Sequence, residues 1–183
     1  MSQDQDYTPY FQEWIDNYAD DIRALLTLVA DKSAAEELRR LCIGTLNYGL
    51  KQLDLIPDFY TPVGLIDDTM VIRIFANLGI DYIIKLENEV LRSKLVKLSE
   101  GDDIIHKFVG DEIYRALVNY VKSQPDRKVR QRDARIILGN DEILKEFVED
   151  VKVEISGYEG AKITDPVTVQ KDLKSFLKLK LVG

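Results

Sequence analysis

The chain has 183 residues, of which 45% are hydrophobic and 31% are charged, a balance that is ordinary for one soluble domain or for one domain with an appendage. Its single cysteine, Cys42, excludes an intramolecular disulfide and fits a reducing compartment. The chain opens with mostly polar residues and carries Asp4 and Asp6 where a secretory leader would be positively charged, so we expect a cytoplasmic protein.

The charged side chains are unevenly distributed. Residues 1–80 contain 13 acidic and 6 basic side chains, whereas residues 81–183 contain 19 of each. The whole net charge of −7 therefore belongs to the first part. A surface of this sign repels nucleic-acid phosphates and anionic lipids, and it attracts cations or a basic protein partner. We accordingly expect no nucleic-acid-binding function.

Apolar residues at steps of three and four predict two helices in the first 50 residues. Thr8 signals the start of the first helix. Pro9 follows it, and proline at the first helical position loses no hydrogen bond. The second begins at Ser33, which is expected to form a capping box with Glu36. The two apolar stripes are Trp14, Ile15, Tyr18, Ile22, Leu25, Leu26 and Val29, and then Leu38, Leu41, Cys42, Thr45 and Leu46.

The pattern continues through the middle of the chain. A third helix begins near residue 64, and Gly79 either ends it or bends it. Gly101 starts a new helical stretch, which Pro125 closes. The apolar residues of these stretches are Met70, Val71, Ile74, Phe75 and Leu78, then Ile83, Leu86, Val90 and Leu91, then Ile105, Phe108, Val109, Ile113, Leu117, Tyr120 and Val121.

The remaining residues predict a short basic helix over 129–138, another helix from 141 to about 151, and a last helix after 164–166. Residues 151, 153 and 155 also alternate as a strand would, so a short β-segment within 151–160 is an alternative for that stretch. The fold class is therefore all-α, a helical bundle of about seven to eight helices.

Proline and charge interrupt the apolar pattern between residues 123 and 132. We place a domain seam there. Residues 1–123 form a helical domain, and residues 124–183 form a C-terminal helical extension that packs on the first.

The most particular segment spans residues 53–68, where four carboxylates, two prolines and a glycine lie among apolar side chains. These residues are Asp54, Pro57, Asp58, Pro62, Gly64, Asp67 and Asp68. The segment resembles the signature of the bacterial YkvA-like family, catalogued as domain of unknown function 1232. A tyrosine that precedes that signature is matched by Tyr48, whereas Pro62 stands one place later than in the signature. The resemblance covers about residues 45–79 and implies no established activity.

One interpretation of the motif is architectural. Pro57 and Pro62 push the residues before them toward extended backbone and stiffen the connector. Gly64 then turns the chain back, through a positive φ or a close backbone approach. The remaining acidic residues serve as turn and cap residues (Asp54, Asp58) and as first-turn complements of the next helix dipole (Asp67, Asp68).

A second interpretation starts from the repulsion between crowded carboxylates, which a cation or a basic group would relieve. Oxygen ligands of this kind suit Mg2+ or Ca2+, so the candidate metal ligands are Asp54, Asp58, Asp67 and Asp68. A basic side chain from a protein partner would satisfy the same site.

Other chemistry is sparse. Cys42 lies on an apolar stripe, and His106 lacks a predictable nucleophile beside it, so we expect structural roles for both. The basic run from Arg127 to Arg135 lacks aromatic residues for base stacking and is expected to be a solvated helix face. No segment is apolar enough to span a membrane, although Phe59 and Tyr60, or the C-terminal lysines, could contact one peripherally.

From these patterns we expect an interaction or scaffold module that presents an acidic helix-loop-helix, with no catalytic residue assigned. The alternative function is that of a metal-dependent hydrolase, in which the clustered aspartates hold the ion and activate water.

Overall fold

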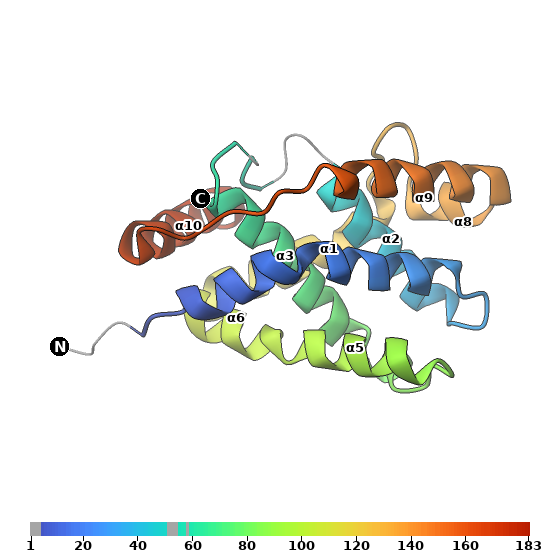
Figure 1. Ribbon diagram of the computed structural model, residues 1–183, viewed down its shortest axis with the longest axis horizontal. Helices are drawn as coiled ribbons and strands as arrows, with labels where there is room; N and C mark the ends of the chain where they lie inside the picture. Colours follow the sequence, from blue (N-terminus) through green and yellow to red (C-terminus); the bar gives the residue numbers. More distant parts are fainter. Residues whose placement is uncertain (1–4, 51–54, 58) are drawn as a thin grey trace.

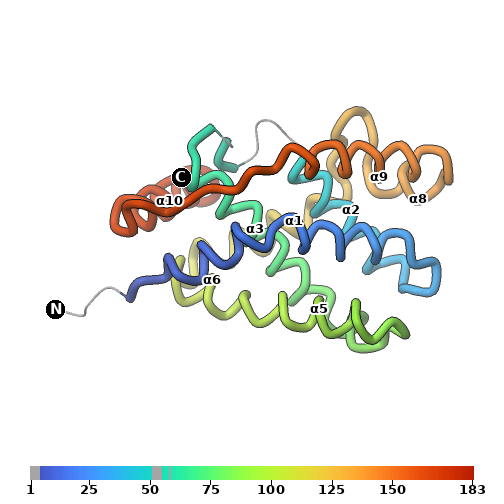
Figure 2. Tube along the Cα trace, in the orientation of Figure 1, coloured from blue at the N-terminus to red at the C-terminus, as the bar shows by residue number. Residues whose placement is uncertain are grey.

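The computed structural model describes residues 5–50, 55–57 and 59–183 and confirms the all-α fold class (Figures 1 and 2). Helical elements follow one another along the whole of this part of the chain. They are α1 Thr8–Ala30, α2 Glu36–Gly49, α3 Val63–Leu78, α4 Ile80–Ile83, α5 Glu89–Ser99, α6 Gly101–Val109, α7 Asp111–Ser123, the 3-10 turn η1 Gln124–Asp126, α8 Ala134–Leu138, α9 Asp141–Ser156 and α10 Pro166–Leu181.

Helix α3 lies at the centre of the molecule. It contacts α1, α2, α5, α6, α7 and α10, and almost every one of its residues is buried (Figure 1). A helix that is enclosed on all sides is normally apolar all round. This helix nevertheless carries Asp67, Asp68 and Arg73 in the interior, so those charges need specific partners.

Several helix ends differ from the sequence prediction. The expected capping box of Ser33 does not form, because the Ser33 hydroxyl donates to Asp31 Oδ1 (2.6 Å) instead. The basic helix begins only at Ala134, since residues 129–132 form a tight turn and the Asp133 carboxylate caps the helix by accepting from the Ile136 amide (2.9 Å).

The alternative of a β-segment within 151–160 is wrong. Helix α9 continues to Ser156, and residues 157–165 form a loop. The apolar side chains that face the core are Phe147, Val151 and Ile155, four residues apart, whereas Val153 is exposed. The stretch is helical because helical spacing places these apolar side chains together on the one face that covers the core.

The C-terminal helices contribute to the same core as the first ones. Val151 and Leu177 belong to the hydrophobic cluster that includes Phe11 and Phe75. The loop after α9 runs along α1 before α10 begins, and α10 contacts both α3 and α7 (Figure 1). The division of the chain at residue 123 stays a prediction. No helix among the described residues combines the length and the apolarity that crossing a membrane requires.

Helix α2 packs closely against the turn that follows α7. A Cβ atom added to Gly44 would lie 2.5 Å from the backbone nitrogen of Pro125. The obstacle is backbone rather than the end of a flexible side chain, so the two elements would have to move apart. Gly44 is thus required by packing, although it sits inside a helix where alanine is intrinsically favoured.

We expect Gly44→Ala to lower the free energy of unfolding by about 1–3 kcal/mol, the usual cost of overpacking. Gly157→Ala is the matched control, because an added Cβ there meets nothing closer than 3.8 Å. Thermal and urea unfolding of the two variants measure the difference. Equal stabilities would contradict the packing argument.

Candidate functional site

Tyr48 and Asp67 form the link between the two helices of the motif. The Tyr48 hydroxyl, near the end of α2, donates a hydrogen bond to Asp67 Oδ2 in α3. Both side chains are buried, Asp67 completely. Because a buried carboxylate that loses its donor is costly, this bond fixes the position of α3 relative to α2.

The same hydroxyl also holds the chain that connects the helices. The Leu55 amide donates to Tyr48 Oη (3.2 Å), and the ring of Tyr120 in α7 stands edge-on to the Tyr48 ring (centroids 5.9 Å apart). A single phenol group thus accepts a bond from the connector and donates one to the following helix. Tyr48, the tyrosine that precedes the motif, thus holds α3 and the connector against α2, and we call this arrangement the clamp.

The architectural interpretation of the motif needs correction at two points. Helix α3 begins at Val63, so Asp67 and Asp68 lie in its second turn and not in the first. Gly64 is inside the helix and does not adopt a positive φ, which among the described glycines is found at Gly110 and Gly160. The stiff turn comes instead from Pro57, whose carbonyl accepts from the Tyr60 amide (2.9 Å).

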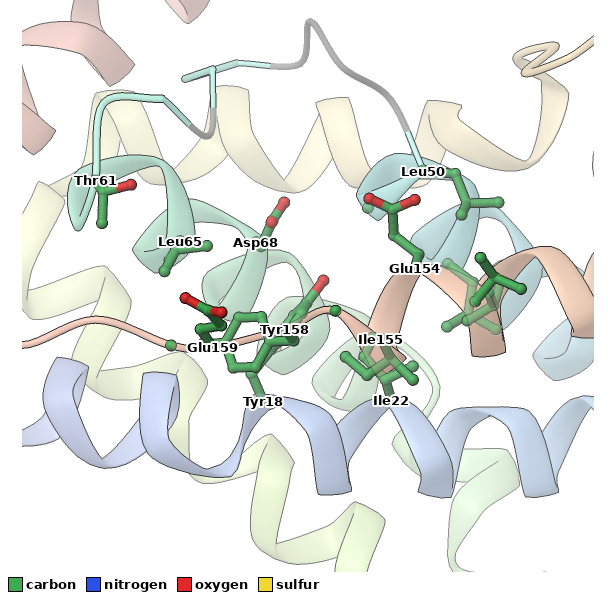
Figure 3. Close-up of a pocket in the computed structure, with 16 residues that line it drawn as sticks. Tyr18, Ile22, Leu50, Thr61, Leu65, Asp68, Glu154, Ile155, Tyr158 and Glu159 are labelled. Carbon is green, nitrogen blue, oxygen red and sulfur yellow. The ribbon is translucent and has the colours of Figure 1, made fainter.

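A pocket of about 480 Å³ opens beside the motif (Figure 3). Its walls come from α1, the end of α2, the start of α3, the end of α9 and the loop after α9. Asp68 lines this pocket, whereas Asp67 does not. Figure 3 shows Asp68 between Glu159 on one side and Glu154 on the other.

The lining combines acidic groups with aromatic and apolar walls. Among the described residues that line the pocket, Asp68, Glu154 and Glu159 are carboxylates and none is basic. Asp68 is only 6% exposed, while the two glutamates are exposed at the rim. A negative charge set deep in a concave wall attracts cations more strongly than the same charge on an open surface.

Tyr158 forms one wall of the pocket, and the negative charge of Asp68 affects the pKa of its hydroxyl. Its ring packs on Tyr18 (centroids 4.9 Å apart), and its hydroxyl donates to the Ile15 carbonyl (2.8 Å). Burial, followed by the negative charge of Asp68, raises the pKa of Tyr158 well above its ordinary value. The phenol therefore stays neutral and acts as a fixed wall at physiological pH.

The other buried charge of α3 is balanced inside the protein. Arg73 Nη2 lies 3.3 Å from Asp21 Oδ2, and Lys94 Nζ lies 2.7 Å from Asp21 Oδ1. The Arg73 guanidinium also covers the Trp14 ring at 4.3 Å. Burial lowers the pKa of Arg73 to about 10, against the opposing effect of the Asp21 carboxylate, so the side chain remains charged at neutral pH. This group is an internal tie between α3 and α1.

The predicted metal ligands are only partly described. Asp54 and Asp58 lie outside the described residues, and Asp67 and Asp68 point to different surroundings, one to Tyr48 and one to the pocket. Within residues 5–50, 55–57 and 59–183, no three His, Cys, Asp or Glu side chains are close enough to hold a metal ion. The Mg2+ or Ca2+ site stays a prediction.

Comparison with known proteins singles out the same helix pair. Residues 39–73 match a family model described as a protein of unknown function. That family is DUF1232. The matched segment includes Tyr48 and Asp67, which form the clamp. It also includes Asp68, which lines the pocket, and Arg73, which ties α3 to α1. No curated protein and no solved structure matches the chain.

The predicted basic run is largely engaged within the C-terminal part. Arg130 Nη1 lies 3.2 Å from Asp150 Oδ1, and Arg132 pairs with Asp150 and with Glu146 of α9. Arg127 covers the Tyr120 ring at 5.1 Å. The prediction of one solvated helix face is therefore wrong for these arginines, because Arg127 packs on α7 and a turn directs Arg130 and Arg132 onto α9.

Cys42 and His106 occupy structural positions. Cys42 is fully buried, its thiol donates to the Leu25 carbonyl (3.4 Å), and burial raises the pKa of that thiol. His106 stacks on Tyr114 (centroids 4.2 Å apart) and pairs with Asp111 (2.7 Å). Neither lines the pocket.

Sequence reasoning missed the far wall of the pocket. Glu154, Tyr158 and Glu159 lie about ninety residues from Asp68 in the chain, and the sequence carries no signal that joins them. Tyr158 and Glu159 belong to the loop after α9. Its Gly160 has a positive φ, which is where a glycine is needed to bring the chain back along α1.

We expect Tyr48→Phe to lower the free energy of unfolding by about 1–3 kcal/mol, because the buried Asp67 carboxylate and the Leu55 amide both lose a partner. Tyr82→Phe removes a hydroxyl from a partly exposed tyrosine and serves as the control. Urea unfolding measures both. A Tyr48→Phe variant as stable as the control would show that the clamp contributes nothing.

A second expectation concerns pH. The hydrogen bond from Arg132 lowers the pKa of Asp150 below its ordinary value of 3.8, so the ionised form stabilises the fold above that value and the contribution is lost as the pH falls through the lowered pKa. Asp150→Asn should therefore be less stable than the wild type at pH 7, by up to about 1 kcal/mol for a partly exposed pair. The two melting curves should converge as the pH falls below 3.8. A difference that is constant with pH would contradict this.

Proposed function

We propose that the protein is an interaction module whose pocket receives the basic side chain of a protein partner. The lining carries the proposal, since three carboxylates line a concave site whose other walls are aromatic and apolar. A lysine or arginine side chain is attracted by this acidic lining, and its aliphatic part suits the apolar walls formed by Ile22, Leu50 and Leu65.

The division of roles within the motif supports binding rather than catalysis. Tyr48 and Asp67 are joined to each other and hold the connector, so they keep α2 and α3, which supply part of the pocket wall, in a fixed relative position. Asp68, on the next position of the same helix, is the buried carboxylate that lines the cavity. A preorganised charge of this kind binds a cation with little rearrangement.

We also propose that the motif segment is of the YkvA-like type. This assignment implies no known activity. The metal-dependent hydrolase is the competing function. It requires an ion on the aspartates, which a calorimetric titration with Mg2+ and with Ca2+ detects directly.

The test is selection from a random-sequence peptide display library on the immobilised wild-type chain. We expect peptides enriched in lysine or arginine. The best of them should bind Asp68→Asn about tenfold more weakly, because a charge-assisted hydrogen bond is lost.

Asp81→Asn is the matched control, since Asp81 is exposed and does not line the pocket. Its affinity should equal that of the wild type, and circular dichroism confirms that both variants are folded. Selected peptides without basic residues, or an affinity that Asp68→Asn leaves unchanged, would overturn the proposal. Ion binding that disappears in Asp68→Asn would replace it with the metal function.

A further inference from the structure

Two aromatic side chains project from the connector just before α3. Phe59 is 74% exposed and Tyr60 is 46% exposed, and their ring centroids lie 4.6 Å apart. The ring of Phe176 in α10 lies 5.1 Å from that of Tyr60, between centroids, and supports the pair. Stacked rings at the surface leave a large apolar area in water, and such an area is typical of a place where something binds.

The end of α10 continues this apolar area. Leu179 follows Phe176 by three residues and Lys180 follows it by four, so both lie on the helix face that carries Phe176. Leu179 is 68% exposed, and Lys180 is exposed as well. In Figure 1 the C-terminal end of α10 lies next to the start of α3. We call Phe59, Tyr60, Phe176, Leu179 and Lys180 the aromatic-basic surface.

Helix α10 is basic, in contrast to the chain as a whole. It contains four lysines and one aspartate, whereas the chain has a net charge of −7. Helix α9, with six acidic and two basic residues, lies toward the other end of the molecule (Figure 1). A protein with this charge distribution turns its α10 side toward a negatively charged surface. The negative charges elsewhere oppose the approach only weakly, since salt screens them beyond about 10 Å at 0.1 M ionic strength.

The shape of the aromatic-basic surface indicates the kind of partner that fits it. Its aromatic side chains project from the protein, and neither Phe59, Tyr60 nor Phe176 lines the pocket beside the motif. Projecting apolar side chains insert between lipid headgroups, whereas a peptide is commonly bound in a groove. Tyrosine and lysine both suit the boundary of a bilayer, because their polar ends stay in the headgroup layer while their apolar parts pack against acyl chains.

We propose that the protein binds peripherally to anionic phospholipid bilayers through the aromatic-basic surface. Phe59 and Leu179 enter the boundary between the headgroups and the acyl chains. Lys178 and Lys180, which flank Leu179 and are both exposed, contact the lipid phosphates. The inference goes beyond the proposed function and does not depend on it, because none of these residues lines the pocket.

Co-sedimentation of the wild-type chain with vesicles tests the inference. We expect binding to vesicles of phosphatidylcholine and phosphatidylserine that weakens as the salt concentration rises, and about tenfold weaker binding to phosphatidylcholine alone. Phe59→Ser and Leu179→Ser should each weaken binding about tenfold, because each removes an inserted apolar side chain. Lys178→Glu/Lys180→Glu should weaken it at least as much, since two attractions become repulsions.

Two control variants lie away from this surface. Tyr82→Ser removes an exposed aromatic side chain from α4. Lys85→Glu/Lys145→Glu gives the same change in net charge as the lysine variant of α10, at exposed positions before α5 and in α9. Both should bind vesicles as the wild type does, and circular dichroism confirms that every variant is folded.

Three results would overturn the inference. They are a wild type that does not bind phosphatidylserine vesicles, binding that the variants of the aromatic-basic surface leave unchanged, and an equal loss in the control variants. The pocket proposal is tested separately, because peptides that bind Asp68→Asn more weakly support it whether or not vesicles are bound. Selected peptides that require Phe59, without any vesicle binding, would assign the surface to a protein partner instead.

Discussion

The hydrogen bond between Tyr48 and Asp67 is the constraint on which the motif depends. Asp67 is completely buried in the central helix, and a carboxylate in that position requires a donor from another element. Tyr48 provides the donor and accepts from the Leu55 amide with the same oxygen. The connector and both helices are therefore positioned by one phenol group, and the direction in which Asp68 faces follows from that positioning.

A second polar tie acts on the same helix. Arg73 pairs with Asp21 of α1, whereas Asp67 bonds to Tyr48 of α2. Apolar packing alone would tolerate a helix that slides or rotates between its neighbours, because many apolar contacts are interchangeable. Two buried charges with different partners leave α3 one register, and Gly101 assists by leaving room for the Arg73 side chain. The central helix is thus placed by its polar residues as much as by its apolar ones.

The sequence was sufficient for elements that have one buried face. Helix α1 shows the apolar spacing of an amphipathic helix, and its observed start at Thr8 agrees with the predicted one to within one residue. Local competition between polar groups was harder to foresee, since the hydroxyl of Ser33 binds Asp31 and not the amide that a capping box requires. The pocket could not be assembled from the sequence, because Asp68, Tyr18 and Tyr158 meet only after α9 and its loop have folded back along α1. Spacing along the chain carries no information about such a meeting.

Only part of the pocket lies in the segment that matches a known family. Its floor, with Asp68, belongs to the segment matched by the DUF1232 family, whereas the wall with Glu154, Tyr158 and Glu159 lies far outside that segment. A chain that shares the floor but has another wall would keep the same charged anchor and present a different cavity above it. Under the proposed function the segment would serve as a common base, and the ligand that is bound would depend on the loop after α9 while the helices that carry the fold remain unchanged.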